Sequence, residues 1–221
     1  MKSNQLAKYI DHTLLKQSAS RADIIELCNE AKEYGFFSVC VQPCHTTLAK
    51  ESVHGTDVKV AVVVGFPMGA NEPEIKAKET ALAVSRGADE IDMVINVGLA
   101  LEGRWQEVEK EIALVKKAAG RATLKVIIET SFLTAEQIVS ACNCCTAAGA
   151  EFVKTSTGFF GAGASVENVA LMKKTVGTKA QVKASGGIRD LETALAMIAA
   201  GADRLGVSAG VKIIEEARKN D

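Results

Sequence analysis

The sequence predicts a (β/α)8 barrel, built as one domain over residues 1–221. Short runs that are almost continuously apolar alternate with amphipathic stretches, which is typical of parallel strands buried on both faces and covered by helices. Eight such units in 221 residues average about 28 residues each, near the lower limit for this barrel. An open doubly wound sheet fits the same alternation. Its glycine fingerprint is missing, however, because Gln42-Pro43-Cys44-His45 follows the first clear strand.

The strands are predicted from short apolar runs rich in β-branched residues. Successive runs start 22 to 34 residues apart, which is the length of one strand and one helix. The shorter and more polar segment Tyr9–Leu14 supplies an eighth strand. In chain order, the seven clear strands are Phe36–Val41, Val58–Val64, Glu90–Ile95, Leu124–Ile128, Phe152–Val153, Gln181–Ala184 and Arg204–Val207.

The helices are predicted from apolar residues that recur with the helical period. After Ser20, the residues Ile24, Leu27 and Ala31 follow one another at steps of 3 and 4. Gly35 ends this helix, because glycine is common just past a helix C-terminus. The same reasoning predicts a helix over Trp105–Ala119 before Gly120, one opened by the capping box of Thr134 and Gln137 and ended by Gly149, and two with Ser165 and Asp190 as N-caps.

Composition excludes several classes of protein. The chain has 26 basic and 27 acidic side chains, whereas binding to a phosphate backbone needs a clear basic excess, so nucleic acid is not its ligand. The longest apolar stretch, Val60–Ala70, contains Gly65 and Pro67 and is shorter than the roughly 20 residues that span a membrane. Met1–Leu15 has no hydrophobic block typical of a secretory signal. We therefore expect a cytoplasmic protein without a membrane partner.

The cysteines and histidines do not form a recognisable metal motif. Three of the six cysteines crowd into residues 142–145, the two spaced pairs of a zinc ribbon are missing, and the chain is neither short nor secreted, so we expect buried free thiols. The three histidines lack the helical spacing of zinc ligands. No metal site is predicted.

Two lysines lie in or at the end of predicted buried strands, where an ammonium group is costly. Lys154 follows Phe152–Val153, and Lys183 lies 29 residues later, which places the two on neighbouring strands. Two ammonium groups at one barrel mouth repel each other, so we expect one amine to lose its proton more easily. A neutral amine attacks carbonyl compounds to form a Schiff base. Alternatively, each lysine extends to solvent or pairs with a carboxylate such as Glu129.

Two carboxylates occupy comparable positions, Asp92 within Glu90–Ile95 and Asp11 within the first strand. Asp92 can tie a lysine in place or carry a proton, and the two roles are compatible. A single buried lysine would favour a structural role. Two lysines together with Asp92 favour catalysis at the carboxyl ends of the strands, where such barrels carry their active sites.

Glycines lie at or just after the ends of the last two predicted strands. Ser185-Gly186-Gly187 precedes a helix, and Gly206-Val207-Ser208 ends the final strand. Barrels of this kind often bind phosphate in the loops after strands 7 and 8, where glycines expose backbone N–H groups at a helix N-terminus. The residues alone therefore predict a barrel enzyme with an imine-forming lysine and a phosphorylated carbonyl substrate.

Motifs along nearly the whole chain resemble those of the deoxyribose-phosphate aldolases, a family of class I aldolases. The most specific of them are Ile10-Asp11-His12-Thr13-Leu14-Leu15-Lys16, Ser38-Val39-Cys40-Val41, Val64-Gly65-Phe66-Pro67, Ala88–Asn96, Lys125–Thr130, Phe152–Gly158 and Gly186-Gly187-Ile188-Arg189.

The resemblance implies reversible cleavage of 2-deoxy-D-ribose 5-phosphate to D-glyceraldehyde 3-phosphate and acetaldehyde, in deoxyribose phosphate catabolism. It implies that Lys154 forms the Schiff base and that Asp92 relays protons. It also implies that Lys183, the second lysine, lowers the pKa of the first and takes part in proton transfer. The remaining roles that it implies are contacts to the sugar hydroxyls by Asp11 and Thr157, and phosphate binding around Gly158, Gly186, Gly187 and Ser208. No cofactor and no metal are implied.

Some positions depart from the family pattern, and two alternatives remain open. Phe159 follows Gly158 where some members carry a phosphate-binding lysine, Ala209 follows Ser208 where a second serine is common, and Ser185 replaces an alanine. The chain ends at Asp221 with no tyrosine in its tail, whereas some longer members have one. The alternatives are another phosphosugar aldolase or isomerase on the same barrel, and a non-catalytic phosphosugar-binding barrel. A homodimer is an expectation from the resemblance alone.

Overall fold

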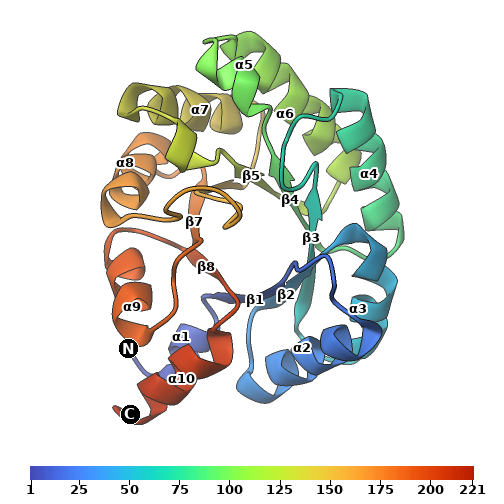
Figure 1. Cartoon of the computed structure of the whole chain (residues 1–221), viewed down its shortest axis with the longest axis vertical. Coiled ribbons are helices and arrows are strands. Elements are labelled where there is room, and N and C mark those ends of the chain that lie inside the picture. The colour runs from blue at the N-terminus through green and yellow to red at the C-terminus, as the bar shows by residue number, and fades with distance from the viewer.

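A computed structural model describes all residues 1–221, and its strands close into the predicted barrel (Figure 1). Eight parallel strands pair in chain order, and β8 closes the barrel by pairing with β1. The strands are β1 (Ile10–Leu14), β2 (Ser38–Val41), β3 (Lys59–Val64), β4 (Glu90–Val94), β5 (Thr123–Ile127), β6 (Phe152–Lys154), β7 (Gln181–Ser185) and β8 (Arg204–Val207).

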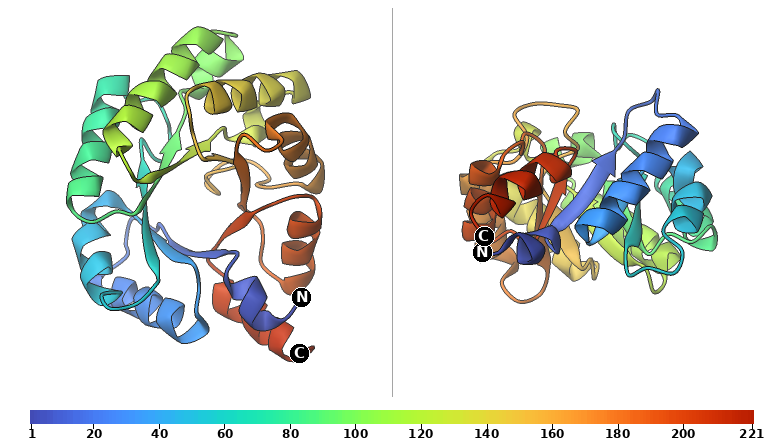
Figure 2. Two further views of the ribbon diagram at one scale, coloured as in Figure 1. Left: turned by 180° about the vertical axis from the view of Figure 1, so that it is seen from behind. Right: turned by 90° about the horizontal axis from the view of Figure 1, so that it is seen from below.

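Helices surround the barrel as an outer layer in every view (Figure 1, Figure 2). They are α1 (Ser3–Ala7), α2 (Arg21–Tyr34), α3 (Thr46–Ser52), α4 (Pro73–Ser85), α5 (Val97–Leu101), α6 (Trp105–Ala119), α7 (Ala135–Ala147), α8 (Val166–Val176), α9 (Leu191–Ala199) and α10 (Gly210–Arg218), with 3-10 turns at Pro43–His45 and Thr130–Phe132.

The capping residues predicted from the sequence begin the helices as expected. Thr134 accepts a hydrogen bond from the backbone N–H of Gln137, and Ser165 and Asp190 each accept one from the third residue of their helix. Gly35 ends α2 in the left-handed conformation, with φ 68°, which glycine adopts without steric cost. The predicted strand bounds are off by one or two residues at several ends, where pairing to the neighbouring strand stops earlier or later than the apolar run.

Alternation along each strand decides which side chains enter the barrel. On β1, Asp11 and Thr13 point inward, while Ile10 and His12 face the helices. The outward residues of all strands pack against the helices in one core of 53 buried residues. The interior of the barrel instead carries charged side chains at the level of the strand centres. This polar interior is what positions the site.

The two chain termini lie side by side at one corner of the molecule (Figure 1, Figure 2). The backbone N–H and the hydroxyl of Ser3 donate to the carboxylate of Asp221 at 2.8 and 2.5 Å, and α1 packs against α10.

None of the helices has the length and the apolar character that a membrane-spanning helix needs. Five of the six cysteines are buried free thiols as expected, whereas Cys44 is exposed because its 3-10 turn runs along the surface.

Candidate active site

Asp92 on β4 lies at the centre of a buried cluster of charges inside the barrel. Its Oδ2 accepts hydrogen bonds from the Nζ atoms of both Lys154 and Lys183, each at 2.8 Å. Its Oδ1 accepts a third from Lys125 on β5 at 2.9 Å. The predicted repulsion between Lys154 and Lys183 is therefore offset, because one carboxylate oxygen lies between the two amines.

Three further charged groups, Asp11, Glu90 and Arg204, complete the cluster around this centre. Asp11 accepts from Lys183 at 2.5 Å and from the Arg204 guanidinium at 2.7 Å. Glu90 accepts from Lys125 at 2.6 Å. The Arg204 guanidinium also stacks on the ring of Phe37, 3.4 Å from its centroid. The ion-pair cluster is defined here as Asp11, Glu90, Asp92, Lys125, Lys154, Lys183 and Arg204, and every member is buried.

Electrostatics keep the central groups of the cluster charged. Burial by itself raises the pKa of Asp92, but Lys125, Lys154 and Lys183 outweigh burial and hold that pKa well below its ordinary value. Burial by itself lowers the pKa of Lys183, but Asp11 and Asp92 outweigh it and raise the pKa. Lys183 is thus fixed as an ammonium ion at neutral pH.

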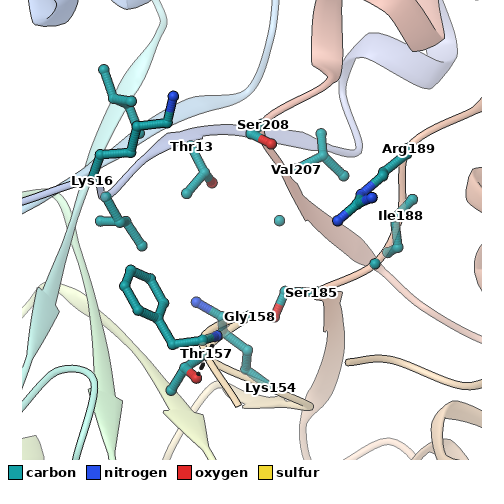
Figure 3. A pocket seen from close by; sticks show the side chains of 16 residues that line it. Thr13, Lys16, Lys154, Thr157, Gly158, Ser185, Ile188, Arg189, Val207 and Ser208 are labelled. Atoms are coloured by element: carbon teal, nitrogen blue, oxygen red, sulfur yellow. Dashed lines mark hydrogen bonds between the residues drawn. The ribbon is translucent and has the colours of Figure 1, made fainter. Parts of the chain in front are cut away.

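Lys154 is the one member of the cluster that lines the cavity at the catalytic end of the barrel. This cavity has a volume of about 240 Å³ and lies at the carboxyl ends of the strands, where Figure 3 shows the Lys154 side chain directed into it. Lys183, Asp92 and Asp11 do not line it. Its walls are Thr13, Leu14, Leu15, Lys16, Lys154, Thr157, Gly158, Phe159, Ser185, Gly186, Gly187, Ile188, Arg189, Gly206, Val207 and Ser208.

Thr157 lines the cavity three residues beyond Lys154, the last residue of β6. Its hydroxyl donates to Oε2 of the buried Glu129 and accepts from the backbone N–H of Phe159 at 3.1 Å. Glu129 itself has a positive φ of 44°, an uncommon conformation for a residue other than glycine. Glu129 therefore orients Thr157 and does not pair with a lysine, contrary to the structural alternative considered for Lys154 and Lys183.

Glycines bring the loops after β6 and β7 together at the other end of the cavity. A side chain at Gly163 would place its Cβ 2.5 Å from the backbone of Gly186, so only glycine allows this approach. The backbone N–H groups of Gly187 and Ser208 donate no hydrogen bond within the chain. Arg189 extends its guanidinium toward the cavity from this side (Figure 3) and forms no ion pair. These donors can bind an anion.

All four residues predicted to bind phosphate line the cavity at this glycine-rich end. They are Gly158, Gly186, Gly187 and Ser208. Asp11 is separated from the cavity, because Thr13 occupies the next inward position on β1 and lies one layer nearer the mouth. Sequence reasoning assigned no role to Lys125, Glu90, Arg204 or the Arg189 side chain, and it considered Glu129 only as a partner of a lysine. Lys125 showed the same signal as Lys183, a lysine in the middle of an apolar strand. No set of three or more histidine, cysteine, aspartate or glutamate side chains is arranged to hold a metal ion.

Comparison with known proteins gives one consistent family. Residues 5–216 match the DeoC/LacD family of aldolases. The deoxyribose-phosphate aldolase of Geobacillus sp. (strain WCH70) is 57% identical over 213 residues, which cover 96% of each chain. That of Mannheimia succiniciproducens is 53% identical over 220 residues, covering 100% of this chain and 98% of the relative.

Solved structures agree with the sequence comparison. The tetrameric deoxyribose phosphate aldolase from Aeropyrum pernix superimposes with a TM-score of 0.92 at 32% identity, covering 99% of this chain and 93% of that one. An aldolase named QR15 superimposes with a TM-score of 0.93 at 43% identity, covering 97% and 96% of the two chains.

Proposed function

The chain belongs to the DeoC/LacD family of aldolases, and from this premise we propose that it cleaves 2-deoxy-D-ribose 5-phosphate reversibly to D-glyceraldehyde 3-phosphate and acetaldehyde. The reaction proceeds through a Schiff base on Lys154. One observation carries this assignment: of the three buried lysines that share Asp92, only Lys154 reaches the cavity.

A count of charges favours Lys154 as the neutral amine. The ion-pair cluster holds four cationic groups, Lys125, Lys154, Lys183 and Arg204, and three carboxylates, Asp11, Glu90 and Asp92. With every group ionised, one positive charge is left over in a buried site, which is costly. Lys183 and Lys125 each contact two or more carboxylates, whereas Lys154 contacts Asp92 alone. Release of the Lys154 proton therefore balances the cluster and produces the nucleophile.

The carbon–carbon bond breaks because the iminium ion accepts its electrons. The free amine of Lys154 attacks C1 of the substrate, and loss of water from the carbinolamine forms the iminium ion. The C3 hydroxyl gives up its proton, the C2–C3 electron pair moves to the iminium to form an enamine, and C3 leaves as the aldehyde of glyceraldehyde 3-phosphate. Protonation of the enamine at C2 and addition of water then release acetaldehyde and restore Lys154.

Asp92 and Lys183 serve the proton transfers. Asp92 contacts Nζ of Lys154 directly and relays protons through water to the carbinolamine, the C3 hydroxyl and C2. Lys183 remains an ammonium ion that orients the Asp92 carboxylate, and Asp11 in turn orders Lys183. Thr157 has its own proton committed to Glu129, so its oxygen accepts a hydrogen bond from a sugar hydroxyl.

The phosphate group of the substrate binds at the glycine-rich wall. Gly158, Gly186, Gly187 and Ser208 surround it with backbone N–H groups and a hydroxyl, and Arg189 supplies a positive charge. Phe159 occupies the position where a lysine helps to bind phosphate in some members, which makes Arg189 the nearest cation on this wall.

The remaining parts of the proposal concern the setting of the reaction. We propose a cytoplasmic enzyme that needs no cofactor and acts on a small phosphosugar and acetaldehyde, with neither nucleic acid nor a membrane as a partner. A homo-oligomer, in the simplest case a homodimer, is its proposed assembly.

The proposed function is tested by incubating the purified protein with 2-deoxy-D-ribose 5-phosphate in the presence of EDTA and identifying the products. We expect D-glyceraldehyde 3-phosphate and acetaldehyde in equal amounts, at a rate that EDTA does not change. Turnover of a different phosphosugar alone would support another aldolase or isomerase. Binding without turnover would support the non-catalytic alternative, and a rate restored by zinc after chelation would point to metal-stabilised chemistry.

A further inference from the structure

His12 is a buried side chain that the proposed reaction does not use. It follows Asp11 on β1, and the alternation of the strand turns it outward, away from the ion-pair cluster. Only 3% of the residue is exposed, and its Nε2 lies 2.6 Å from Oε2 of Glu30 on α2. His12 thus connects the first strand of the barrel to the helix outside it.

The opposite edge of the imidazole faces the beginning of α10. A Cβ at Gly210, the first residue of α10, would lie 2.8 Å from Nδ1 of His12 and 3.1 Å from the ring of Phe36. The start of this helix therefore rests directly on the His12 ring, with no space between them. In the barrel register His12 is also paired with Val207, the last residue of β8. Figure 1 shows α2 and α10 beside β1 and β8.

The segment that His12 supports forms one wall of the cavity. Ser208 lines the cavity, and only Ala209 separates it from α10. Ala209 has no side-chain oxygen to cap the helix, and the backbone N–H groups of Ser208 and Gly210 donate no hydrogen bond within the chain. An uncapped helix N-terminus attracts an anion through these free donors and through the helix dipole.

We infer that His12 is a positioning residue for phosphate recognition: bridged to Glu30 and packed against Gly210, it holds Ser208 and the first turn of α10 at the phosphate end of the cavity. This inference rests on the proposed function for the identity of the anion. Two adjacent residues of β1 then have different roles. Asp11 acts on the lysine chemistry inside the barrel, and the next residue acts on phosphate affinity from outside it.

The test compares phosphorylated and unphosphorylated substrates. In His12→Leu the bridge to Glu30 is lost, and we expect KM for 2-deoxy-D-ribose 5-phosphate to rise at least about fivefold, the effect of weakening one hydrogen bond to an anion. The kcat/KM for 2-deoxy-D-ribose, which has no phosphate, is expected to change less than about twofold. His12→Gln keeps a donor in reach of Glu30 and is expected to recover part of the affinity.

Two more variants change the contacts of His12, one on the side of Glu30 and one on the side of Gly210. Glu30→Ala removes the partner of Nε2, and Gly210→Ala pushes a methyl group against Nδ1, so both are expected to raise the same KM. Glu33→Ala is the matched control, because Glu33 lies exposed on the same helix and forms no ion pair or hydrogen bond.

Binding of inorganic phosphate, measured by the rise in Tm that it causes, gives a readout independent of turnover. We expect a smaller rise in His12→Leu and Gly210→Ala than in the wild type and Glu33→Ala. Equal phosphate binding in all four proteins would overturn the inference, as would a parallel loss of activity with both sugars. A wild type that binds phosphate but cleaves no substrate would refute the proposed function and leave the inference on phosphate standing.

Discussion

Two groups of buried charges occupy different layers of the molecule, and they differ in how completely their cations are paired. Outside the barrel, Lys76 on α4 donates to Glu111 on α6 at 2.5 Å and to the carbonyl oxygens of Gly69 and Val94 at 2.6 and 2.8 Å. All three of its protons are used. Inside the barrel, Lys154 has a single carboxylate partner and one face on a cavity.

The pKa shifts of the two groups also have opposite causes. Burial raises the pKa of Glu111 and lowers that of Lys76, and their mutual attraction does not fully offset burial. In the ion-pair cluster, several opposite charges outweigh burial at Asp92 and Lys183. Burial of a charge therefore does not by itself mark a catalytic group. A catalytic amine is instead recognised in a cluster where it has few charged partners and lines a cavity that a ligand can enter.

The largest expected effect is on turnover in Asp92→Asn. Loss of the carboxylate that Lys125, Lys154 and Lys183 share removes the proton relay, and kcat is expected to fall by about 10²–10⁴-fold. Steady-state kinetics measure this, with the folded fraction followed by circular dichroism. Asp57→Asn is the control, because Asp57 is exposed and unpaired. A kcat within threefold of wild type, roughly 0.7 kcal/mol, would show that Asp92 is not needed for proton transfer.

The Lys76 pair is expected to affect stability and not chemistry. Lys76→Met leaves Glu111 buried without its partner, and the free energy of unfolding is expected to fall by about 3–5 kcal/mol. Where the variant is folded, its kcat should stay within about twofold of wild type. Urea unfolding and kinetics at low temperature measure the two quantities.

The double variant Lys76→Met with Glu111→Leu sharpens the same comparison. Both charges are then removed, and part of the stability lost in Lys76→Met is expected to return, because no unpaired charge stays buried. Full recovery is not expected, because the carbonyl oxygens of Gly69 and Val94 lose their donor. A loss of kcat in the double variant as large as that in Asp92→Asn would contradict the view that the Lys76–Glu111 pair serves stability and the ion-pair cluster serves catalysis.

The smallest expected effect is the pH dependence of stability. The pKa values of Asp11 and Asp92 are lower in the folded chain than in the unfolded chain, where aspartate titrates near 4. The stability that these two ionised carboxylates contribute is therefore fully present above about pH 4. It is lost as the pH falls from there toward the pKa values of the two groups in the folded chain. We expect about 1–3 kcal/mol to be lost between pH 4 and pH 2.

Urea midpoints measured across this range check the pH prediction. Asp92→Asn should flatten the loss below pH 4, while Asp57→Asn should leave it unchanged. An equal slope in wild type and Asp92→Asn would contradict the assigned ionisation of Asp92.

The barrel and the proximity of Asp92, Lys154 and Lys183 could be predicted because their signals are local. Apolar runs at regular intervals predict the units, and a lysine or aspartate inside such a run is conspicuous, as at Asp92 and Lys183. Glu90 and Arg204 begin their strands, where a charge usually reaches solvent, so only the closed barrel shows that they point inward. The Lys76–Glu111 pair was equally hidden, since each residue alone looks like an ordinary helix surface charge.

The position of Asp11 illustrates a different limit. Its inward direction follows from strand alternation, but its depth depends on the register with β2 and β8, where it lies beside Ser38 and Gly206. Register is a property of the assembled sheet. The sequence could therefore place Asp11 inside the barrel without showing that Thr13, two residues later, is the one that lines the cavity.

The most direct test of the central claim identifies the lysine that forms the imine. The protein is incubated with acetaldehyde, the imine is reduced with borohydride, and the modified peptide is located by mass spectrometry. We predict an ethyl group on Lys154 alone. In Lys154→Met we predict no trapped imine, although the variant is expected to be as fully folded as the wild type by circular dichroism. An ethyl group on Lys183 or Lys125, or continued trapping without Lys154, would contradict the account.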